Sequence, residues 1–411
     1  MIYFWWSAGI VLALAWFSRI VEAALGMPTV ADISRPEWDR PVSSSGNPKI
    51  SIIVPARNEE ETIEASLRSL LWLDHDHYEV IVVNDRSTDR TGEIMDRLKS
   101  EWDESSTGDA PCLADFARRG NRGSRRPILR MIHHAELPHG WLGKTHAMWT
   151  AANAASGEWL LFTDADVIFR PDSLRRALVY AEAEKADHVV LFPRMIMKTL
   201  GERMMIAFFQ TLFMFGHRPW KVADPKANDH MGVGAFNLVR RRVYDAIGTY
   251  AALRMEVVDD MKLGKLVKTS GFTQRNVFGD DLISIRWARG AIGVVNNLTK
   301  NFFAVLSFQR WRTLASAFAL TFLNLGPFLG IWLAHGWTRL AYAIALASMF
   351  CIYIGISRRS SVPAYYFFLH PVSSALFVYT LLRSMVLTLW HDGVIWRGTR
   401  YPLEDLRKGL V

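Results

Sequence analysis

The sequence predicts an α/β protein with a mainly parallel sheet, flanked by membrane-spanning helices at the N-terminus and the C-terminus. Short apolar runs alternate with helical patterns between residues 50 and 192, and this alternation is typical of βαβ units on a parallel sheet. Long apolar stretches lie near both ends of the chain. Each is close to the roughly 20 residues that a helix needs to cross a bilayer.

The composition agrees with a membrane protein. Half of the 411 residues are hydrophobic, 16 are Trp, and the formal net charge is +8. A basic surface can serve nucleic acid, anionic lipid or phosphate-bearing substrates. Because the sequence has no zinc-finger spacing and no basic heptad pattern, no nucleic acid is expected as a partner. Cys112 lies in a polar stretch and Cys351 in an apolar one, so no disulfide between them is expected.

The first segment, residues 1–26, predicts a transmembrane anchor. Residues 3–17 are almost wholly apolar, and Arg19 follows them. A cleaved signal peptide would carry its positive charge before the apolar core, so we favour an uncleaved anchor with its amino end outside. Residues 27–48 contain Pro and Ser and predict a linker.

The next part of the chain predicts the sheet. Strands are expected at residues 50–55, 79–84, 127–133, 158–163 and 187–192. Helices are expected at residues 59–72, 88–101, 143–155 and 171–184. Segment 103–126 is polar and lacks periodicity, so we expect a mobile insertion there.

The C-terminal third predicts about three membrane helices within residues 313–390. The apolar stretches are 313–335, 338–357 and 364–390; a large helical core is the alternative. Segments 199–216 and 291–312 mix aromatic and basic residues, and each is either an amphipathic helix in the membrane interface or an ordinary packed helix. Residues 391–411 form a basic tail.

This arrangement contains a conflict of topology. Four crossings from an outside amino end would leave the basic tail outside, whereas positive loops prefer the cytoplasmic side. Either one of the three C-terminal stretches is re-entrant, or the number of spans differs from four.

Two carboxylates follow the predicted strand at 158–163. Asp164 and Asp166 come directly after Trp159-Leu160-Leu161-Phe162, at the edge where open α/β sheets bind their ligands. Alternate residues of an extended chain point in opposite directions, so a bend must bring both acids to one site. Hard oxygen ligands of this type suit Mg²⁺ or Mn²⁺ together with substrate phosphates. A solvated turn is the alternative.

Two further acids share this position after a strand. Glu59 follows the strand at 50–55, and Asp85 follows the strand at 79–84. Parallel strands would place all of these acids on one rim. A helix N-cap is an alternative role for Asp85 and the favoured role for Asp89. The chain lacks Walker-type and dinucleotide-type glycine loops, so a cation would have to neutralise substrate phosphates.

Three other positions carry candidate chemistry. Lys144 opens a helix and could contact phosphate, or it could be solvated. Asp259 and Asp260 repel each other, which favours a general base or acid, although a surface acidic pair is the simpler interpretation. Arg286-Trp287 could hold a diphosphate or stack on a ring, or anchor the membrane interface.

Taken in order, these motifs resemble family 2 glycosyltransferases with the GT-A fold, a Rossmann-like α/β fold. The matching segments are Ile53-Val54-Pro55-Ala56-Arg57-Asn58-Glu59, Val83-Asn84-Asp85-Arg86-Ser87-Thr88-Asp89, Gly143-Lys144, Thr163-Asp164-Ala165-Asp166, Val258-Asp259-Asp260 and Arg286-Trp287. The order of anchor, catalytic domain (49–290) and C-terminal spans resembles the ceramide glucosyltransferase-like and hopanoid-associated branch, as does the ending Trp396-Arg397-Gly398-Thr399-Arg400-Tyr401-Pro402-Leu403.

The resemblance implies roles for the donor site. Pro55 and Glu59 would frame the base and ribose, Asp85 would contact uracil, Lys144 would contact the donor, and Asp164 would face the ribose or sugar. The resemblance also places the metal at Asp166 and the donor sugar beside Gly234. It makes Asp260 the base that deprotonates the acceptor, and Arg286 and Trp287 would close over the diphosphate or the acceptor. Asp259 stands where the family has Glu, so the base could be either aspartate, and Ile283 departs from the family's Gln or Arg.

The resemblance therefore implies a membrane-bound inverting glycosyltransferase. It would move a sugar from a nucleotide-sugar donor, a UDP-sugar being favoured, to a lipid hydroxyl at the cytoplasmic face of a bacterial inner membrane. A polysaccharide synthase and a catalytically inactive membrane scaffold of the same fold are the alternatives.

Overall fold

The computed structural model describes residues 2–42, 47–105 and 126–411. The chain divides into a sheet unit and a helical unit. The sheet unit comprises Val30–Arg194, Val222–Ile285 and Lys408–Val411, and the helical unit comprises Met1–Thr29, Met195–Lys221 and Arg286–Arg407. Most of the insertion predicted at 103–126 lies outside the described residues.

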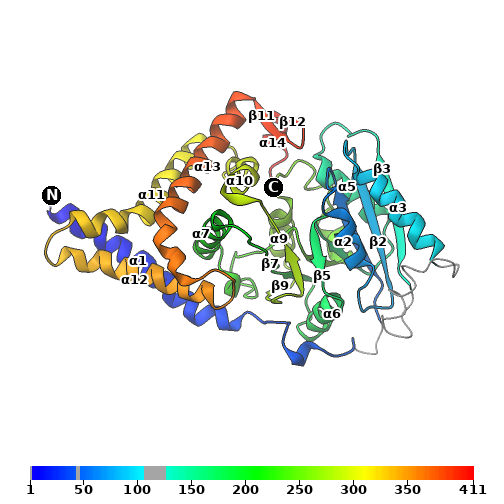
Figure 1. The fold of residues 1–411 in the computed structure, drawn as a ribbon, viewed down its shortest axis with the longest axis horizontal. Coiled ribbons are helices and arrows are strands. Elements are labelled where there is room, and N and C mark those ends of the chain that lie inside the picture. Colours follow the sequence, from blue (N-terminus) through cyan, green and yellow to red (C-terminus); the bar gives the residue numbers. More distant parts are fainter. Residues whose placement is uncertain (1, 43–46, 106–125) are drawn as a thin grey trace. The chain divides into compact units, whose positions relative to one another are not determined.

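The sheet unit is built on a seven-stranded sheet in the order β3-β2-β1-β4-β8-β6-β9 (Figure 1). All five predicted strands are confirmed. The strands are β1 (Ile50–Ala56), β2 (Tyr78–Asp85), β3 (Ile128–His134), β4 (Trp159–Phe162), β6 (His188–Leu191), β8 (Asn237–Arg240) and β9 (Gln274–Val277).

The sheet is parallel except for β8, which runs antiparallel to both β4 and β6. The neighbouring pairs β1–β2, β2–β3, β1–β4 and β6–β9 are parallel. The fold-class prediction of a mainly parallel α/β sheet is therefore confirmed. Because β2, β1 and β4 are adjacent and point the same way, their carboxyl ends meet at one edge.

Helices and a smaller sheet complete this unit. The predicted helices are confirmed as α2 (Ile63–Leu70), α3 (Thr91–Glu104), α5 (Gly143–Ala154) and α6 (Ser173–Ala183), and two unpredicted helices are α8 (Arg241–Ala246) and α9 (Asp259–Thr269). The second sheet has the order β5-β10-β7, with β5 (Val167–Phe169), β10 (Ile283–Ile285) and β7 (Arg194–Met195). The core between sheet and helices is apolar, with Ile53, Ile81 and Leu160 fully buried.

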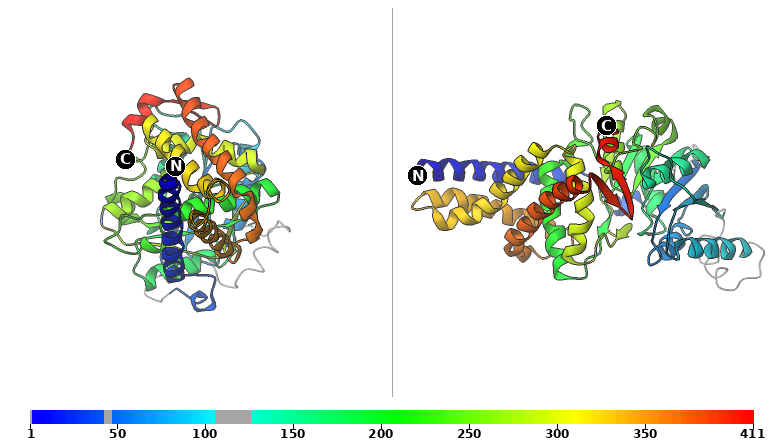
Figure 2. Two further views of the ribbon diagram at one scale, coloured as in Figure 1. Left: turned by 90° about the vertical axis from the view of Figure 1, so that its left-hand side faces the viewer. Right: turned by 90° about the horizontal axis from the view of Figure 1, so that it is seen from above.

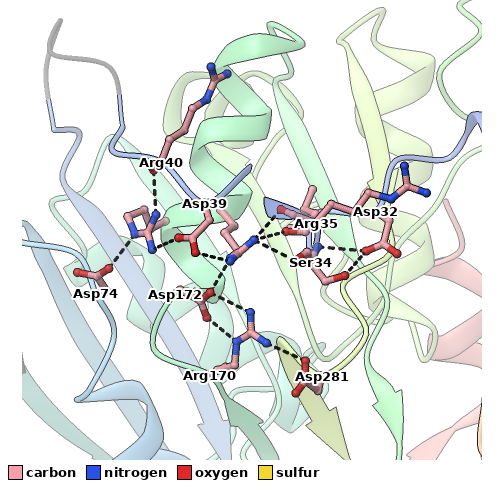
Figure 3. A network of polar contacts seen from close by, with 12 residues as sticks. Asp32, Ser34, Arg35, Asp39, Arg40, Asp74, Arg170, Asp172 and Asp281 are labelled. Atoms are coloured by element: carbon pink, nitrogen blue, oxygen red, sulfur yellow. Dashed lines mark hydrogen bonds and ion pairs between the residues drawn. The ribbon is translucent and has the colours of Figure 1, made fainter. Parts of the chain in front are cut away.

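Polar contacts connect the segment before β1, which includes Asp32, Ser34 and Arg35, to Asp172 at the start of α6 (Figure 3), and the buried Arg176 is central to them. The side chain of Arg176 donates to the carbonyl oxygens of Ile33, Ser34 and Arg35, a segment that precedes η2 (Pro36–Trp38). It also forms ion pairs with Asp172 and Asp39 at 2.5 and 2.8 Å. Burial alone would raise the pKa of Asp172, but hydrogen bonds from Arg170 and Arg176 outweigh it and lower that pKa to about 2.

The helical unit contains the predicted membrane stretches. Its helices are α1 (Ile2–Gly26), η1 (Met27–Thr29), α7 (Leu200–Gly216), η3 (Pro219–Lys221), α10 (Gly290–Val305), α11 (Arg310–Leu333), α12 (Thr338–Ser357), η4 (Ala364–Leu369) and α13 (His370–Trp390). The tail adds β11 (Gly393–Trp396), β12 (Thr399–Pro402) and α14 (Leu403–Lys408). Four of these segments, 3–29, 310–333, 338–357 and 364–390, are long and apolar enough to cross a membrane.

The exposed side chains of these four helices are strongly apolar. Leu14, Phe318 and Trp332 are 63%, 72% and 81% exposed, which would be costly in water and indicates membrane association. By contrast, α7 buries Met205, Phe208 and neighbouring apolar residues in the core of the unit. On α10, Ile292 and Val305 near the two ends are exposed, while Val294, Leu298 and Phe303 are buried.

We predict that Arg176→Met lowers the free energy of unfolding of the sheet unit by about 3 kcal/mol, because it takes from the partly buried carboxylate of Asp172 one of its two arginine partners and leaves the carbonyls of residues 33–35 without the buried guanidinium that binds them. The measurement is the thermal transition of the detergent-solubilised protein. Arg90→Met is the matched control: Arg90 pairs with Glu60 at the surface, and surface pairs contribute little. Equal melting temperatures for the two variants would contradict the role of Arg176.

Candidate active site

The candidate site lies at the carboxyl ends of β1, β2 and β4. Asp85 is the last residue of β2 and is only 3% exposed. Two guanidinium groups compensate its charge: Arg86 Nε lies 2.8 Å from Oδ1, and Arg57 Nη1 lies 3.4 Å from Oδ2. A side chain at Gly143 would collide with the Asp85 carboxylate. The first residue of α5 therefore has to be small, because the helix begins directly against Asp85.

The bend that Asp164 and Asp166 require is present. After β4 the chain turns at Ala165 and Asp166 before it enters β5. The backbone N–H of Asp164 donates to the carbonyl oxygen of Gly234 at 3.0 Å. A Cβ atom at Gly234 would collide with the Asp164 carboxylate. The loop around Gly234 and the acidic turn thus lie in direct contact.

Asp259 and Asp260 form the first turn of α9. The two carboxylate oxygens of Asp260 accept backbone hydrogen bonds from Gly234, at 2.8 Å, and from Met261, at 2.7 Å. Gly232 approaches the carbonyl oxygen of Asp260 so closely that no Cβ atom would fit. A helix N-terminus stabilises carboxylates, so this position favours both side chains. The sequence analysis did not predict α9.

Lys144 connects these acids. Its Nζ lies 2.9 Å from Asp164 Oδ1 and 3.5 Å from Asp259 Oδ1. Asp259 is buried and also accepts a hydrogen bond from the Tyr250 hydroxyl at 3.4 Å. The structure therefore brings Asp85, Lys144, Asp164, Gly234, Asp259 and Asp260 together around the N-terminus of α5. We call Lys144, Asp164, Asp259 and Asp260 the acidic cluster.

The cluster shifts the pKa of two of its members. Burial alone would lower the pKa of Lys144, but the charges of Asp164, Asp259 and Asp260 outweigh it and raise that pKa above the usual lysine value. Burial raises the pKa of Asp260, while the charge of Lys144 and the backbone N–H groups of Met261 and Gly234 oppose the rise. Lys144 is thus held in its charged form, and Asp260 becomes a stronger base than an exposed aspartate.

Glu59 and Pro55 lie at the same edge of the sheet. Pro55 is the sixth residue of β1 and pairs in register with Val83 of β2. Glu59 accepts a hydrogen bond from the Thr62 hydroxyl at 3.0 Å, and its backbone N–H donates to Thr91. Asp89 accepts hydrogen bonds from the backbone N–H groups of Thr91 and Glu60. Asp89 is therefore not the N-cap that the sequence favoured, because Arg90 occupies that position, but its side chain still accepts a hydrogen bond from Thr91, the first residue of α3.

Sequence reasoning missed several residues around Asp85. The rings of His134 and His146 lie 4.5 Å apart, and Trp141 packs against His146. Burial lowers the pKa of both histidines, so both rings are neutral at neutral pH. Arg57 and Arg86 both lie within the motifs quoted from the sequence. A predicted buried acid, Asp85, needs a cation nearby, and this need could have identified the two arginines as its partners. The two histidines come from separate elements and gave no such signal.

Arg286 and Trp287 belong to the helical unit. Arg286 Nη2 pairs with Glu202 of α7 at 2.8 Å. Glu202 is fully buried and accepts further hydrogen bonds from the backbone N–H groups of Gly290 and Lys198, at 2.9 and 2.6 Å. The Trp287 ring packs against Phe209, and its carbonyl accepts a hydrogen bond from Asn297. Sequence reasoning did not identify Glu202, which is the buried partner of Arg286.

The acids fit a cation that is shared with a substrate. Within the described ranges, no group of three or more His, Cys, Asp or Glu side chains is arranged to hold a metal ion. Magnesium-type ions are usually held by one or two carboxylates together with substrate phosphates. Lys144 engages Asp164, and the same turn carries Asp166 as a second, half-buried carboxylate.

The opposite edge of the sheet has a different character. A cavity of about 860 Å³ is lined there by the first residue of β4, Trp159, and the last of β8, Arg240, together with Arg242 and Asp187. Asp187 already pairs with both arginines. The parallel strands begin at this edge, and only the antiparallel β8 ends there. Open α/β sheets bind their ligands at the other edge, where the parallel strands end.

Comparison with known proteins agrees with this geometry. The chain is 21% identical over 402 residues to 4,4'-diaponeurosporenoate glycosyltransferase from Staphylococcus aureus strain MRSA252, covering 95% of this chain and 99% of that protein. The same enzyme from Staphylococcus haemolyticus is 21% identical over 251 residues, covering 61% of this chain and 59% of that protein.

A solved structure shares the fold. The mannosyltransferase PcManGT from Pyrobaculum calidifontis, in complex with GDP-Man and Mn²⁺, aligns over 94% of this chain and 99% of that chain, with a TM-score of 0.52 and 20% identity. The family described as Glycosyl transferase family 2 matches residues 51–260, which is more than half of the chain and includes every member of the acidic cluster. The chain belongs to glycosyl transferase family 2.

Proposed function

We propose that this glycosyltransferase transfers a sugar, with inversion, from a nucleotide sugar to a hydroxyl group of a lipid acceptor. The observation that carries the proposal is the acidic cluster. In it, the backbone N–H of Gly234 binds the Asp260 carboxylate, whose pKa is raised by burial, and Lys144 and Asp164 lie beside it. The site residues, the catalytic segment 49–290 and the choice of UDP as the nucleotide are parts of this proposal.

Asp260 serves as the general base. An oxygen of its carboxylate takes the proton of the acceptor hydroxyl while the oxygen of that hydroxyl attacks the anomeric carbon, and the bond from that carbon to the diphosphate oxygen breaks. Burial favours this transfer because it raises the proton affinity of Asp260. Asp259 is the weaker candidate, since Lys144 and Tyr250 already engage it.

The other residues bind and orient the donor. Asp85, which is fixed by Arg57 and Arg86, contacts the base, with Pro55 and Glu59 beside it. Lys144 and the N-terminus of α5 face the phosphates. Gly234 leaves room beside Asp164 for the sugar. Asp166 would hold Mg²⁺ or Mn²⁺, and such an ion would neutralise charge on the departing diphosphate.

The lipid acceptor is supported by two observations. Four helices are long and apolar enough to cross a membrane, so the protein is associated with the phase in which a lipid acceptor resides. The relative from Staphylococcus aureus is named for a carotenoid, 4,4'-diaponeurosporenoate. Because nucleotide sugars are cytosolic, the sheet unit faces the cytoplasm. Extraction of the labelled product into organic solvent tests the lipid against a polysaccharide, and the absence of any donor turnover would indicate an inactive scaffold.

We predict that Asp260→Asn lowers kcat about 10²–10⁴-fold, the usual contribution of a positioned base, and leaves the Kd for the nucleotide sugar unchanged. The measurement is steady-state sugar transfer together with calorimetric donor binding. Asp245→Asn, an exposed position on α8, is the matched control and should keep full activity. A fully active Asp260→Asn enzyme would show that the assignment of Asp260 as the base is wrong.

We predict that Asp166→Asn removes the dependence of donor affinity on Mn²⁺. The substitution keeps the shape of the side chain and removes the charge that attracts the cation. Calorimetric titration of the nucleotide sugar with and without Mn²⁺ measures the effect. If the variant still gains affinity from Mn²⁺ to the same extent as the wild type, Asp166 is not the metal ligand.

We predict that Lys144→Gln moves the acidic limb of the kcat/KM–pH profile to higher pH. The base must be deprotonated to act, and the Lys144 charge lowers the pKa of Asp260, so removal of that charge raises it further. Lys144→Arg keeps the charge and should leave the limb close to its wild-type position. An unshifted limb in Lys144→Gln would mean that the limb does not report Asp260.

A further inference from the structure

The position of the chain end restricts the number of membrane crossings. Residues Lys408–Val411 belong to the sheet unit. The backbone N–H of Val411 donates to Glu256 at 2.5 Å, and Lys265 of α9 donates to its carbonyl oxygen at 3.1 Å. The chain leaves this unit at Arg286 and has returned at Lys408. An even number of crossings must therefore lie between, although three candidate segments are present there.

Three of the four candidate helices lie side by side (Figures 1 and 2). The Tyr342 hydroxyl, near the start of α12, donates to the carbonyl oxygen of Trp5 at 2.9 Å, and Gly9 lies against Ala341. Further along α1, the indole of Trp16 donates to the carbonyl oxygen of Leu323 in α11 at 2.9 Å. The short connection between α11 and α12 is thus level with the amino end of α1. If α1 crosses the membrane, α11 leaves the side of the sheet unit and α12 returns to it.

The helix α13 begins halfway along these three helices. The His370 ring lies 3.1 Å from Asn324 of α11 and 3.0 Å from the hydroxyl of Tyr353 in α12. It also lies beside the Trp16 ring. In Figure 1, α13 then runs at a steep angle to α12. A helix that starts at this depth does not reach the level of the α11–α12 connection.

After His370, α13 packs against α7 and α10, which are not spanning candidates, as well as along α11. Ser373 donates to the Met204 carbonyl oxygen of α7 at 3.2 Å, and Ser384 accepts from the Phe303 N–H of α10 at 2.9 Å. In the second half of α13, Arg383 donates to the Thr299 hydroxyl at 2.5 Å. A charged side chain in the middle of a spanning helix is costly, whereas near the membrane surface it is tolerated.

The distribution of positive charge agrees with two crossings. Arg339 follows the α11–α12 connection closely, and it is the one Lys or Arg within residues 334–340. The opposite ends of these helices and the tail carry Arg310, Arg312, Arg358, Arg359, Arg397, Arg400 and Arg407. Positive residues collect on the cytoplasmic side. If the chain returns to that side after α12, the arginines at these helix ends and in the tail lie on it.

We propose that residues 364–390 form a re-entrant element that enters the cytoplasmic leaflet, turns at His370 and leaves on the same side. The protein then crosses the membrane three times, through α1, α11 and α12. The exposed side chains of Tyr365, Phe368 and Tyr379, which are 62%, 73% and 55% exposed, contact the lipid acyl chains of that leaflet. The assignment of this side as cytoplasmic rests on the proposed function, whereas the number of crossings does not.

Single-cysteine labelling tests this topology. Cys112→Ser and Cys351→Ser give a cysteine-free background, into which His335→Cys, Ser361→Cys or Lys408→Cys is introduced. These positions follow α11, follow α12 and lie in the tail. A membrane-impermeant maleimide is added to right-side-out vesicles, before and after permeabilisation. We expect His335→Cys to react in sealed vesicles, and Ser361→Cys and Lys408→Cys to react only after permeabilisation.

Each other pattern overturns the proposal. Reaction of Lys408→Cys in sealed vesicles would show that α13 crosses or that the tail lies outside. Reaction of Ser361→Cys there would show that α12 does not return. If none of the three cysteines reacted in sealed vesicles, the α11–α12 connection would lie on the same side as the sheet unit, and these two helices would not cross. Monodisperse elution in detergent confirms that each variant is folded. Loss of sugar transfer with the expected labelling pattern would count against the proposed function and leave the topology intact.

Discussion

The contact between Lys144 and the carboxylates of Asp164 and Asp259 is the interaction on which the site depends. Three aspartates from two different loops gather where β4 ends and α9 begins, and without a cation their charges would repel one another. Lys144 is placed by α5, whose first turn is fixed by hydrogen bonds from Leu142 and Thr145 to the Arg254 carbonyl oxygen. The charge balance and the backbone geometry therefore support each other.

Close backbone approach makes this cluster possible. Gly143, Gly232 and Gly234 each lie where a Cβ atom would strike a carboxylate or carbonyl of the site. The glycines let α5, the 232–234 loop and α9 approach more closely than side chains would allow, and the Gly234 N–H can then hold Asp260. The same loop also touches the turn that carries Asp164 and Asp166, so a displacement of this loop would alter both the base and the acidic turn.

The sequence predicted the strands that position the site and missed those that complete it. β1, β2 and β4 are continuous apolar runs followed by polar residues, a pattern that can be recognised in the sequence without knowledge of the fold. β8 and β9 are as short as β4, but they read Asn-Leu-Val-Arg and Gln-Arg-Asn-Val and so lack its continuous apolar run, and β10 has only three residues. The pairing of Glu202 with Arg286, separated by 84 residues, and the docking of Val411 against α9 depend on tertiary packing that no local pattern encodes. In the proposed topology, that docking puts the tail on the side of the sheet unit and removes the conflict seen in the sequence.

The most direct test of the account is an experimental structure of the protein with a nucleotide sugar and Mn²⁺. The account predicts cation density at Asp166, the diphosphate beside Lys144 and the N-terminus of α5, and the anomeric carbon facing Asp260. Donor density at the opposite edge of the sheet, in the cavity lined by Trp159 and Arg240, with the acidic cluster unchanged, would contradict it.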